Sequence, residues 1–433
     1  MSGAGTEPAR DVLPRVVGWL ERNLRFFDPE TWERHLPRRP FRAGPLLELL
    51  GFLRLLSGTP APTPTPTPAP VRPVPEGLRA GALALAEQVV GTAEFTRRLR
   101  RADEFFPYHL NLVALQHLLG RPRPALLHRC EALLVAGAGG HFQPHRPLLS
   151  RLELRYVADR AGVAVPPGVP GLPALYRQSV PGLGADPLAL DDTEIYAFTH
   201  ALFYATDFGA HALPPGAAVD DTVRVLLASH LIGGHLDLLA ELLLCADVVG
   251  LEETGLVRGG RTDLVRRGWT ALASAQRPDG AVPGPVHRPA VLSGLTGEKA
   301  EAYLFGTCYH TTLATGLAAA ARLRQVSRPV PEAPSPCLPE SAAEGTPSPY
   351  PPVGAAPDAV HAWAGAVAAA AAHAAEPDRA RWAEAVTGAL VLCARRRDRP
   401  GLEAVLRAAG VLGVAESPLV RSATARLAAG WCG

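Results

Sequence analysis

One segment of the chain gathers several groups suited to proton transfer. Residues 194–207 read Glu-Ile-Tyr-Ala-Phe-Thr-His-Ala-Leu-Phe-Tyr-Ala-Thr-Asp. His200 and Asp207 are seven positions apart, nearly two helical turns, so we expect both on one helix face beside Phe203 or Tyr204. A histidine held by a carboxylate can act as a general base, although a structural hydrogen-bond network would use the same residues. The candidate catalytic residues are Glu194, His200, Tyr204 and Asp207.

A second segment places a cysteine and a histidine close together. Cys308 and His310 stand at the start of a helix predicted over 307–325. About thirty residues upstream, a helix predicted over 261–275 ends in Gln276, and an Asp279-Gly280 turn follows. Thiolate and imidazole groups are the ligands that zinc prefers.

A helix that ends in a Gln and an Asp-Gly turn, followed by a loop and a Tyr-His-Thr helix start, resembles the repeat of α/α-toroid proteins. The pattern over residues 261–325 is similar to protein prenyltransferase β subunits, in which such a histidine is a zinc ligand. Squalene-cyclase-like terpene cyclases share the toroid and its Gln…Asp-Gly turns. The resemblance implies an all-α fold, an α/α-toroid of helical hairpins that is complete or incomplete, and Zn²⁺ as a cofactor.

The sequence alone does not decide which residues would bind zinc. Two positions along a regular helix separate side chains by about 200°, so Cys308 and His310 can share an ion only if Cys308 lies in the preceding loop. The Asp-x-Cys pair that supplies the other ligands in prenyltransferases does not occur in this chain. His235, His200 or Asp207 would have to substitute, or His310 simply lines a cavity. The candidate metal ligands are His310, Cys308 and His235.

Similar polar openings recur at four predicted helices, which begin near residues 108, 194, 234 and 308. Inner helices of a toroid would place such openings around one mouth of a central cavity. We therefore expect His310 and Glu194 to face the same cavity. The candidate substrate-binding residues are His109, Tyr196, Phe203 and Tyr309.

Acidic residues elsewhere allow two interpretations. Asp237 and Glu241 are four positions apart on a leucine-rich helix predicted over 235–249. If that helix is an inner one, Glu241 is buried and its pKa is raised; otherwise the pair is the polar stripe of a half-exposed helix. The Asp-Asp-Thr runs at 191–193 and 220–222 precede predicted helices, where they cap free amides, and neither continues into a magnesium-diphosphate motif.

Composition and motifs exclude several classes of function. The chain has 43 basic and 41 acidic residues, a net charge of +2, which argues against a nucleic-acid partner. No Walker loop, dinucleotide fingerprint or zincin motif occurs. No signal peptide or run of about 18 apolar residues is visible, so we expect no membrane span. Six cysteines without paired spacing favour reduced thiols and a cytoplasmic location.

Two proline-rich tracts divide a chain that otherwise predicts helices. The expected organisation is N-terminal helices (1–58), a Pro/Thr-rich linker (59–75), a main helical-hairpin domain (76–328), a Pro-rich disordered segment (329–357) and C-terminal helices that complete the array (358–433).

The sequence supports two hypotheses of function. The first is a tailoring enzyme of specialised metabolism, a transferase or a cyclase/lyase. It would act on an apolar, isoprenoid-like or peptidic substrate in a central cavity by acid–base or metal-assisted chemistry. The second is a non-catalytic helical-repeat scaffold that binds a protein partner through the same cavity or its outer face.

Overall fold

The computed structural model describes residues 6–58, 74–214, 219–251, 263–326 and 346–430. All regular elements in these ranges are helical, which confirms the all-α class. None of the helices there combines the length and apolar character needed to cross a bilayer. Most of the linker predicted over 59–75 and of the disordered segment predicted over 329–357 lies outside the described residues. Residues 346–357 are described: Tyr350 is buried there, and Pro357 begins a helix.

The elements follow one another as helices of 5 to 30 residues with two short 3-10 turns. In chain order they are α1 (Thr6–Arg22), η1 (Leu24–Phe27), α2 (Pro29–His35), α3 (Gly44–Ser57), α4 (Glu76–Gly91), α5 (Ala93–Arg101), α6 (Phe106–Leu118), α7 (Pro124–Val135), η2 (Ala138–Gly140), α8 (Leu148–Ala161), α9 (Leu172–Arg177), α10 (Asp192–Thr206), α11 (Asp220–Gly233), α12 (Leu236–Val249), α13 (Leu264–Ala275), α14 (Pro289–Ser293), α15 (Gly297–Val326), α16 (Pro357–Ala370), α17 (Glu376–Arg395), α18 (Arg399–Val411) and α19 (Pro418–Ala428).

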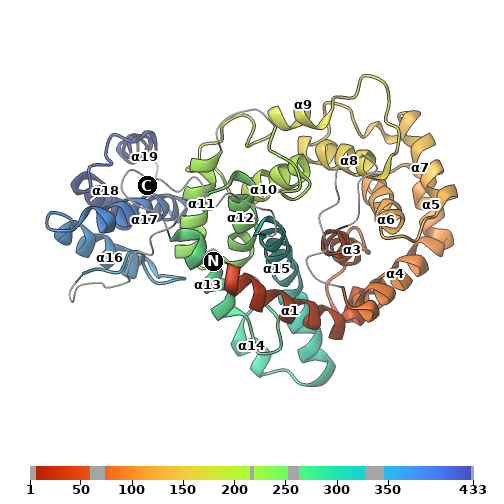
Figure 1. Cartoon of the computed structure of the whole chain (residues 1–433), viewed down its shortest axis with the longest axis horizontal. Coiled ribbons are helices and arrows are strands. Elements are labelled where there is room, and N and C mark those ends of the chain that lie inside the picture. Colours follow the sequence, from red (N-terminus) through yellow and green to blue (C-terminus); the bar gives the residue numbers. More distant parts are fainter. Residues whose placement is uncertain (1–5, 59–73, 215–218, 252–262, 327–345, 431–433) are drawn as a thin grey trace.

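Six helices surround a common centre. Helix α3 packs against α6, α6 against α8, α8 against α10, α10 against α12, and α12 against α15, which returns to α3. Figure 1 looks down this closed order of helices. Most of the connecting helices lie outside: α4 packs on α3 and α6, α9 on α8 and α10, α11 on α12, and α1 on α15. We call α3, α6, α8, α10, α12 and α15 the ring helices.

The leucine-rich sequences of α3 and α12 explain why they are ring helices. Both are apolar on nearly every side, and a helix of that kind must be covered all round. In α12 every residue from Asp237 to Asp247 is buried, and α3 is buried almost as completely. This burial decides the question that Asp237 and Glu241 left open, because their helix belongs to the interior of the protein.

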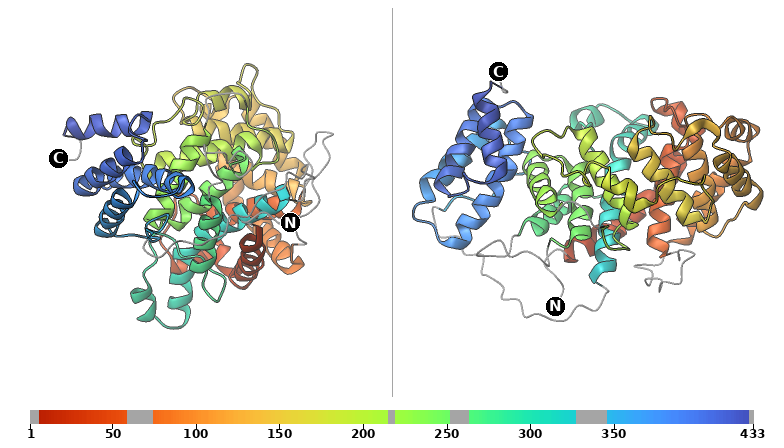
Figure 2. Two further views of the ribbon diagram at one scale, coloured as in Figure 1. Left: turned by 60° about the vertical axis from the view of Figure 1, so that its left-hand side comes forward. Right: turned by 90° about the horizontal axis from the view of Figure 1, so that it is seen from above.

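The C-terminal helices form a separate group. Helices α16, α18 and α19 pack around α17, and α17 lies along α11. Figure 2 shows the group to one side of the ring helices in both views. Their expected role was to complete the helical array; the structure instead attaches them to α11, outside the ring helices.

Some helix boundaries differ from those predicted. The apolar pattern of residues 77–101 predicts a single helix, but the structure interrupts it at Thr92. Thr92 follows the end of α4 and caps α5 by accepting a hydrogen bond from Phe95 N at 3.1 Å. Helix α15 begins at Gly297, ten residues before the predicted start. Cys308 and His310 therefore lie inside a helix rather than at its opening.

Candidate functional site

The ring helices enclose a cavity of about 160 Å³. Each of the six contributes side chains to its wall. Phe52, Leu115, Leu244, Leu313 and Leu317 belong to an apolar part of this wall. The polar part consists of Glu48, Arg54, Asn111, Glu153, Tyr156, His200, Tyr204, Glu241 and His310. A small, largely apolar hollow with a few convergent polar groups is the usual form of a small-molecule site.

His310 is held at one nitrogen by a buried carboxylate. Its Nδ1 lies 2.9 Å from Asp237 Oδ1 and 3.0 Å from Oδ2. Asp237 also accepts hydrogen bonds from Thr311 Oγ1, at 2.7 Å, and from the Tyr196 hydroxyl. The carboxylate thus fixes the imidazole ring and leaves Nε2 as the nitrogen that a bound molecule can reach.

The same contact sets the charge of the pair. Although burial alone would lower it, hydrogen bonding and attraction to Asp237 raise the pKa of His310 to about 10. Burial opposes the charged form of Asp237 as well, but the bond and charge of His310 and the hydrogen bonds from Tyr196 and Thr311 together lower the pKa of Asp237 to about 2. His310 is therefore an imidazolium at neutral pH, and its Nε2–H is a proton donor.

A second histidine lies beside a second buried carboxylate. His200 Nδ1 is 2.9 Å from the carbonyl oxygen of Tyr196 and 3.5 Å from Glu241 Oε2. Thr199 donates its hydroxyl proton to the same carboxylate. Burial raises the pKa of Glu241, against the attraction of His200 and His310. Glu241 is thus a stronger base than an exposed glutamate.

Two further glutamates complete the polar wall. Burial raises the pKa of Glu48 on α3 and of Glu153 on α8. Glu48 lies close enough to His310 for their charges to interact. Glu153 accepts from Asn111 Nδ2 at 3.4 Å and interacts with the Tyr204 hydroxyl. Tyr204 and Phe203, both among the candidate residues of the sequence, line the cavity with His200.

Asp207 does not pair with His200, contrary to expectation. It is the cap residue after α10, with a left-handed φ of 49°, and its side chain turns away from His200 to Arg54, Tyr156 and Arg160. The seven-residue spacing places two side chains on one face only while the helix continues, and α10 ends at Thr206. The partner of His200 is Glu241, from another ring helix.

Glu194 is exposed and does not line the cavity. Its carboxylate accepts from Asp191 N at 2.9 Å, and Asp191 accepts from Glu194 N at 2.8 Å, which together form a capping box at the start of α10. The prediction that Glu194 and His310 face one cavity is therefore wrong. The polar helix start stabilises the helix end rather than binding a substrate.

We predict a small effect for Glu194→Ala. Loss of half the capping box should lower the free energy of unfolding by about 0.5–1 kcal/mol and leave ligand binding unchanged. Urea denaturation and a binding titration would measure both quantities. An unchanged stability combined with lost binding would mean that Glu194 serves the site after all.

The proposed zinc ligands are not brought together. Inside α15, Cys308 and His310 point to different sides: the Cys308 thiol lies 3.8 Å from His287 Nδ1, and burial raises its pKa to about 11. His235 caps α12 by accepting from Leu238 N at 3.2 Å. In their place, Asp237, Glu241 and His310 offer ligand atoms that all lie within 4.8 Å of one another.

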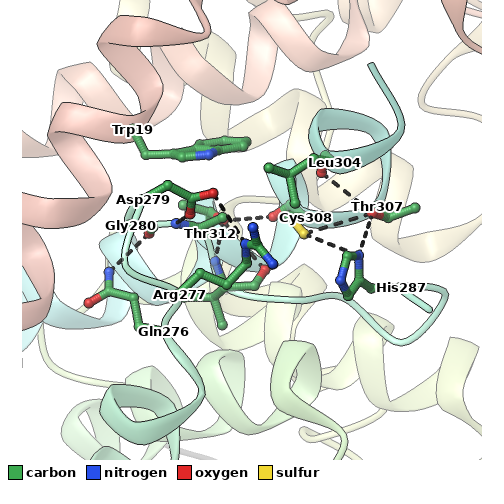
Figure 3. Close-up of polar contacts among 12 residues, drawn as sticks. Trp19, Gln276, Arg277, Asp279, Gly280, His287, Leu304, Thr307, Cys308 and Thr312 are labelled. Carbon is green, nitrogen blue, oxygen red and sulfur yellow. Dashed lines mark hydrogen bonds and ion pairs between the residues drawn. The ribbon is translucent and has the colours of Figure 1, made fainter. Parts of the chain in front are cut away.

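The Gln and Asp-Gly motif is a structural turn (Figure 3). Gln276 Nε2 donates to Gly280 O at 3.0 Å, and Ala281 N donates to Asp279 Oδ1 at 3.0 Å. Gly280 has a φ of 97°, and a β-carbon there would lie 2.2 Å from the Arg15 carbonyl oxygen, so only glycine fits. The motif joins α13 to α1 and α15 and lies outside the cavity lining.

Two predicted substrate-binding residues belong to the core. Tyr309 is buried among the rings of Phe27, Trp32 and Phe305. His109 packs edge-on to Phe41 and Phe95, beside a separate hollow. Neither lines the central cavity. Tyr196 acts indirectly, because its hydroxyl donates to Asp237.

Comparisons with known proteins identify a family without assigning an activity. No curated protein and no solved structure matches the chain. One family model, described as a domain of unknown function (DUF6895), matches residues 13–320. The match begins within α1 and ends within α15, so it spans all six ring helices and excludes α16–α19. The chain belongs to the DUF6895 family.

Proposed function

We propose that this protein is an enzyme of α/α-toroid type that catalyses proton transfer on a small substrate in the central cavity. The closed order of the ring helices and the connecting helices outside them support the toroid. The Gln…Asp-Gly turn between α13 and α15 agrees with the resemblance to prenyltransferase β subunits and terpene cyclases. The reaction itself rests on the side chains of the cavity.

The contact between His310 and Asp237 carries the proposal. It fixes the ring through Nδ1 and keeps the imidazole protonated, so Nε2–H can protonate a basic atom of the substrate. Glu241 lies within 4.8 Å of the same pair and accepts the proton that the substrate loses. His310 gives one proton to the substrate and Glu241 removes one from it, so the number of protons on the substrate is unchanged. An isomerisation or a cyclisation has this balance, and so does a lyase reaction in which the protonated group leaves.

Metal-assisted chemistry is the second candidate, because three ligand atoms converge at Asp237, Glu241 and His310. A divalent ion such as Zn²⁺ would supply a Lewis acid that polarises a substrate oxygen. However, Asp237 already accepts hydrogen bonds from Tyr196 and Thr311 in addition to His310. A bound metal would have to displace the His310 proton. The contacts of Asp237 therefore favour a role in positioning His310 over a role as a metal ligand.

Proton exchange tests the proposal without knowledge of the substrate. The purified protein would be incubated with a mixed small-molecule extract in D₂O, and mass spectrometry would follow deuterium uptake and new products. We expect at least one compound to change, and His310→Gln to slow that change by about 100-fold or more.

The control is His128→Gln, because the His128 side chain is 83% exposed and lies on α7, away from the cavity. Equal rates for His310→Gln and the wild-type protein would overturn the proposal. Loss of the reaction after chelation of a stoichiometric metal would favour the second candidate. Saturable binding of a compound that never changes would favour the non-catalytic scaffold.

A further inference from the structure

Some charged residues of the cavity lining have a strong ion-pair partner, and others do not. Two cationic residues of the lining are paired with carboxylates that do not line the cavity. Arg54 pairs with Asp207, and His310 pairs with Asp237. The carboxylates of the lining are Glu48, Glu153 and Glu241. Among the described residues, none of these three forms an ion pair with an arginine or with Lys299, the single lysine of the sequence. In the part of the chain that the structure describes, these three carboxylates therefore line the hollow without a permanently charged cation as partner.

Two of these carboxylates have an oxygen that accepts no hydrogen bond from the described residues. Glu48 Oε2 is buried and has no hydrogen-bond partner. Glu241 is only 4% exposed, and its bonds to Thr199 and His200 both involve Oε2. A buried acceptor without a partner destabilises the protein, and more so when it is charged. Burial also raises the pKa of both groups, although nearby cationic groups act in the opposite direction.

The surrounding groups distinguish between kinds of cation. Arg39 attracts the Glu48 carboxylate but is not part of the cavity lining, and its guanidinium lies 4.5 Å from the Trp32 ring centre. The cavity itself offers separate carboxylates, which suit an alkylammonium group because its three N–H donors diverge. Phe52, Leu244, Leu313 and Leu317 provide apolar surface for the attached carbon chain.

We propose that the substrate of this cavity is an amphipathic primary amine, with its ammonium group between Glu48 and Glu241 and its carbon chain against the apolar wall. This inference rests on the proposed function, because it names the substrate class of the same site. It also excludes an anionic head group such as a diphosphate, which these glutamates would repel.

Calorimetry with hexylammonium tests the inference, with 1-hexanol and hexanoate as matched neutral and anionic probes. We expect hexylammonium to bind at least tenfold more tightly than either. Glu48→Gln and Glu241→Gln should each weaken hexylammonium binding about tenfold, whereas Glu416→Gln, whose side chain is 90% exposed, should not. Thermal unfolding of each variant would establish that it is folded, and the three-probe comparison on the wild-type protein needs no variant.

Several results would overturn the inference. They are equal binding of hexanol and hexylammonium, tighter binding of hexanoate, and an unchanged affinity in both glutamine variants. Zn²⁺ binding that Glu241→Gln abolishes, without any amine binding, would assign the negative charge to a metal instead. If deuterium exchange still depends on His310 while hexylammonium does not bind, the proposed function stands and the amine inference fails. If hexylammonium binds but no compound is ever transformed, the amine inference stands and the proposed function fails.

Discussion

Asp237→Asn is expected to lower the rate of proton transfer by about 100-fold or more while leaving the cavity walls in place. The amide is nearly the same size as the carboxylate and can still accept from Thr311. It cannot balance the charge of His310, and its NH₂ group would face Nδ1–H. The imidazole would then lose both its fixed orientation and its charge at neutral pH, and either loss impairs an acid that works through Nε2.

Histidine NMR gives the direct measurement. In the wild-type protein the His310 ring should remain protonated at pH 8, because Asp237 raises its pKa from 6.5 to about 10. In Asp237→Asn the ring should titrate near or below its ordinary value. Because the folded-state pKa of His310 is raised and that of Asp237 is lowered, the pair stabilises the fold fully between about pH 4 and pH 6.5. This stabilisation is lost as the pH rises toward 10 and also as it falls toward 2.

Thr96→Ala is the matched control, since Thr96 lies on α5, outside the cavity lining, and changes neither carboxylate nor imidazole. An unshifted His310 titration in Asp237→Asn would contradict the assigned pairing. A shifted titration with an unchanged rate would contradict the role of His310 as the acid.

The helical content could be predicted from the sequence because it depends on local patterns. Apolar residues at three- and four-residue steps, with prolines and glycines between the segments, gave the fold class directly. Helix boundaries that depend on tertiary contacts were harder to predict from the sequence. The first turns of α15 contain Glu298 and Glu301, which pair with Arg25 from just after α1, and nothing near residue 297 announces that partner.

The candidate site could be predicted only in part. His200, Tyr204, Phe203 and His310 were found because polar or aromatic side chains stood out in apolar segments. The interior position of Glu241 was one of two open interpretations. The pairing of His310 with Asp237 joins residues 73 positions apart and requires the packing of α12 on α15. Glu48 and Arg54 were not predicted as site residues. Charged residues in a helix as apolar as α3 could have indicated that they line a cavity.

Arg54→Met is expected to produce the largest loss of stability, about 3 kcal/mol. Arg54 Nη2 lies 2.6 Å from Asp207 Oδ1, and both side chains are about nine-tenths buried. Removal of one partner leaves a buried carboxylate that only Arg160, at 3.2 Å, and Tyr156 can compensate. The same cluster holds Asp207 and Phe208 at φ values of 49° and 54°, a conformation that a phenylalanine adopts only under constraint.

Urea denaturation at several pH values tests this prediction. Arg54 and the other partners hold the pKa of Asp207 well below its ordinary value of 3.8. The stabilisation is therefore complete above about pH 4 and is lost on further acidification, so the difference between wild-type protein and Arg54→Met should shrink as the carboxylate becomes protonated. The double variant Arg54→Met/Asp207→Asn should recover at least half of the loss, because it removes the uncompensated charge. If it recovers nothing, packing of the long Arg54 side chain against Tyr156, rather than the ion pair, holds the end of α10 and the Phe208 wall of the cavity.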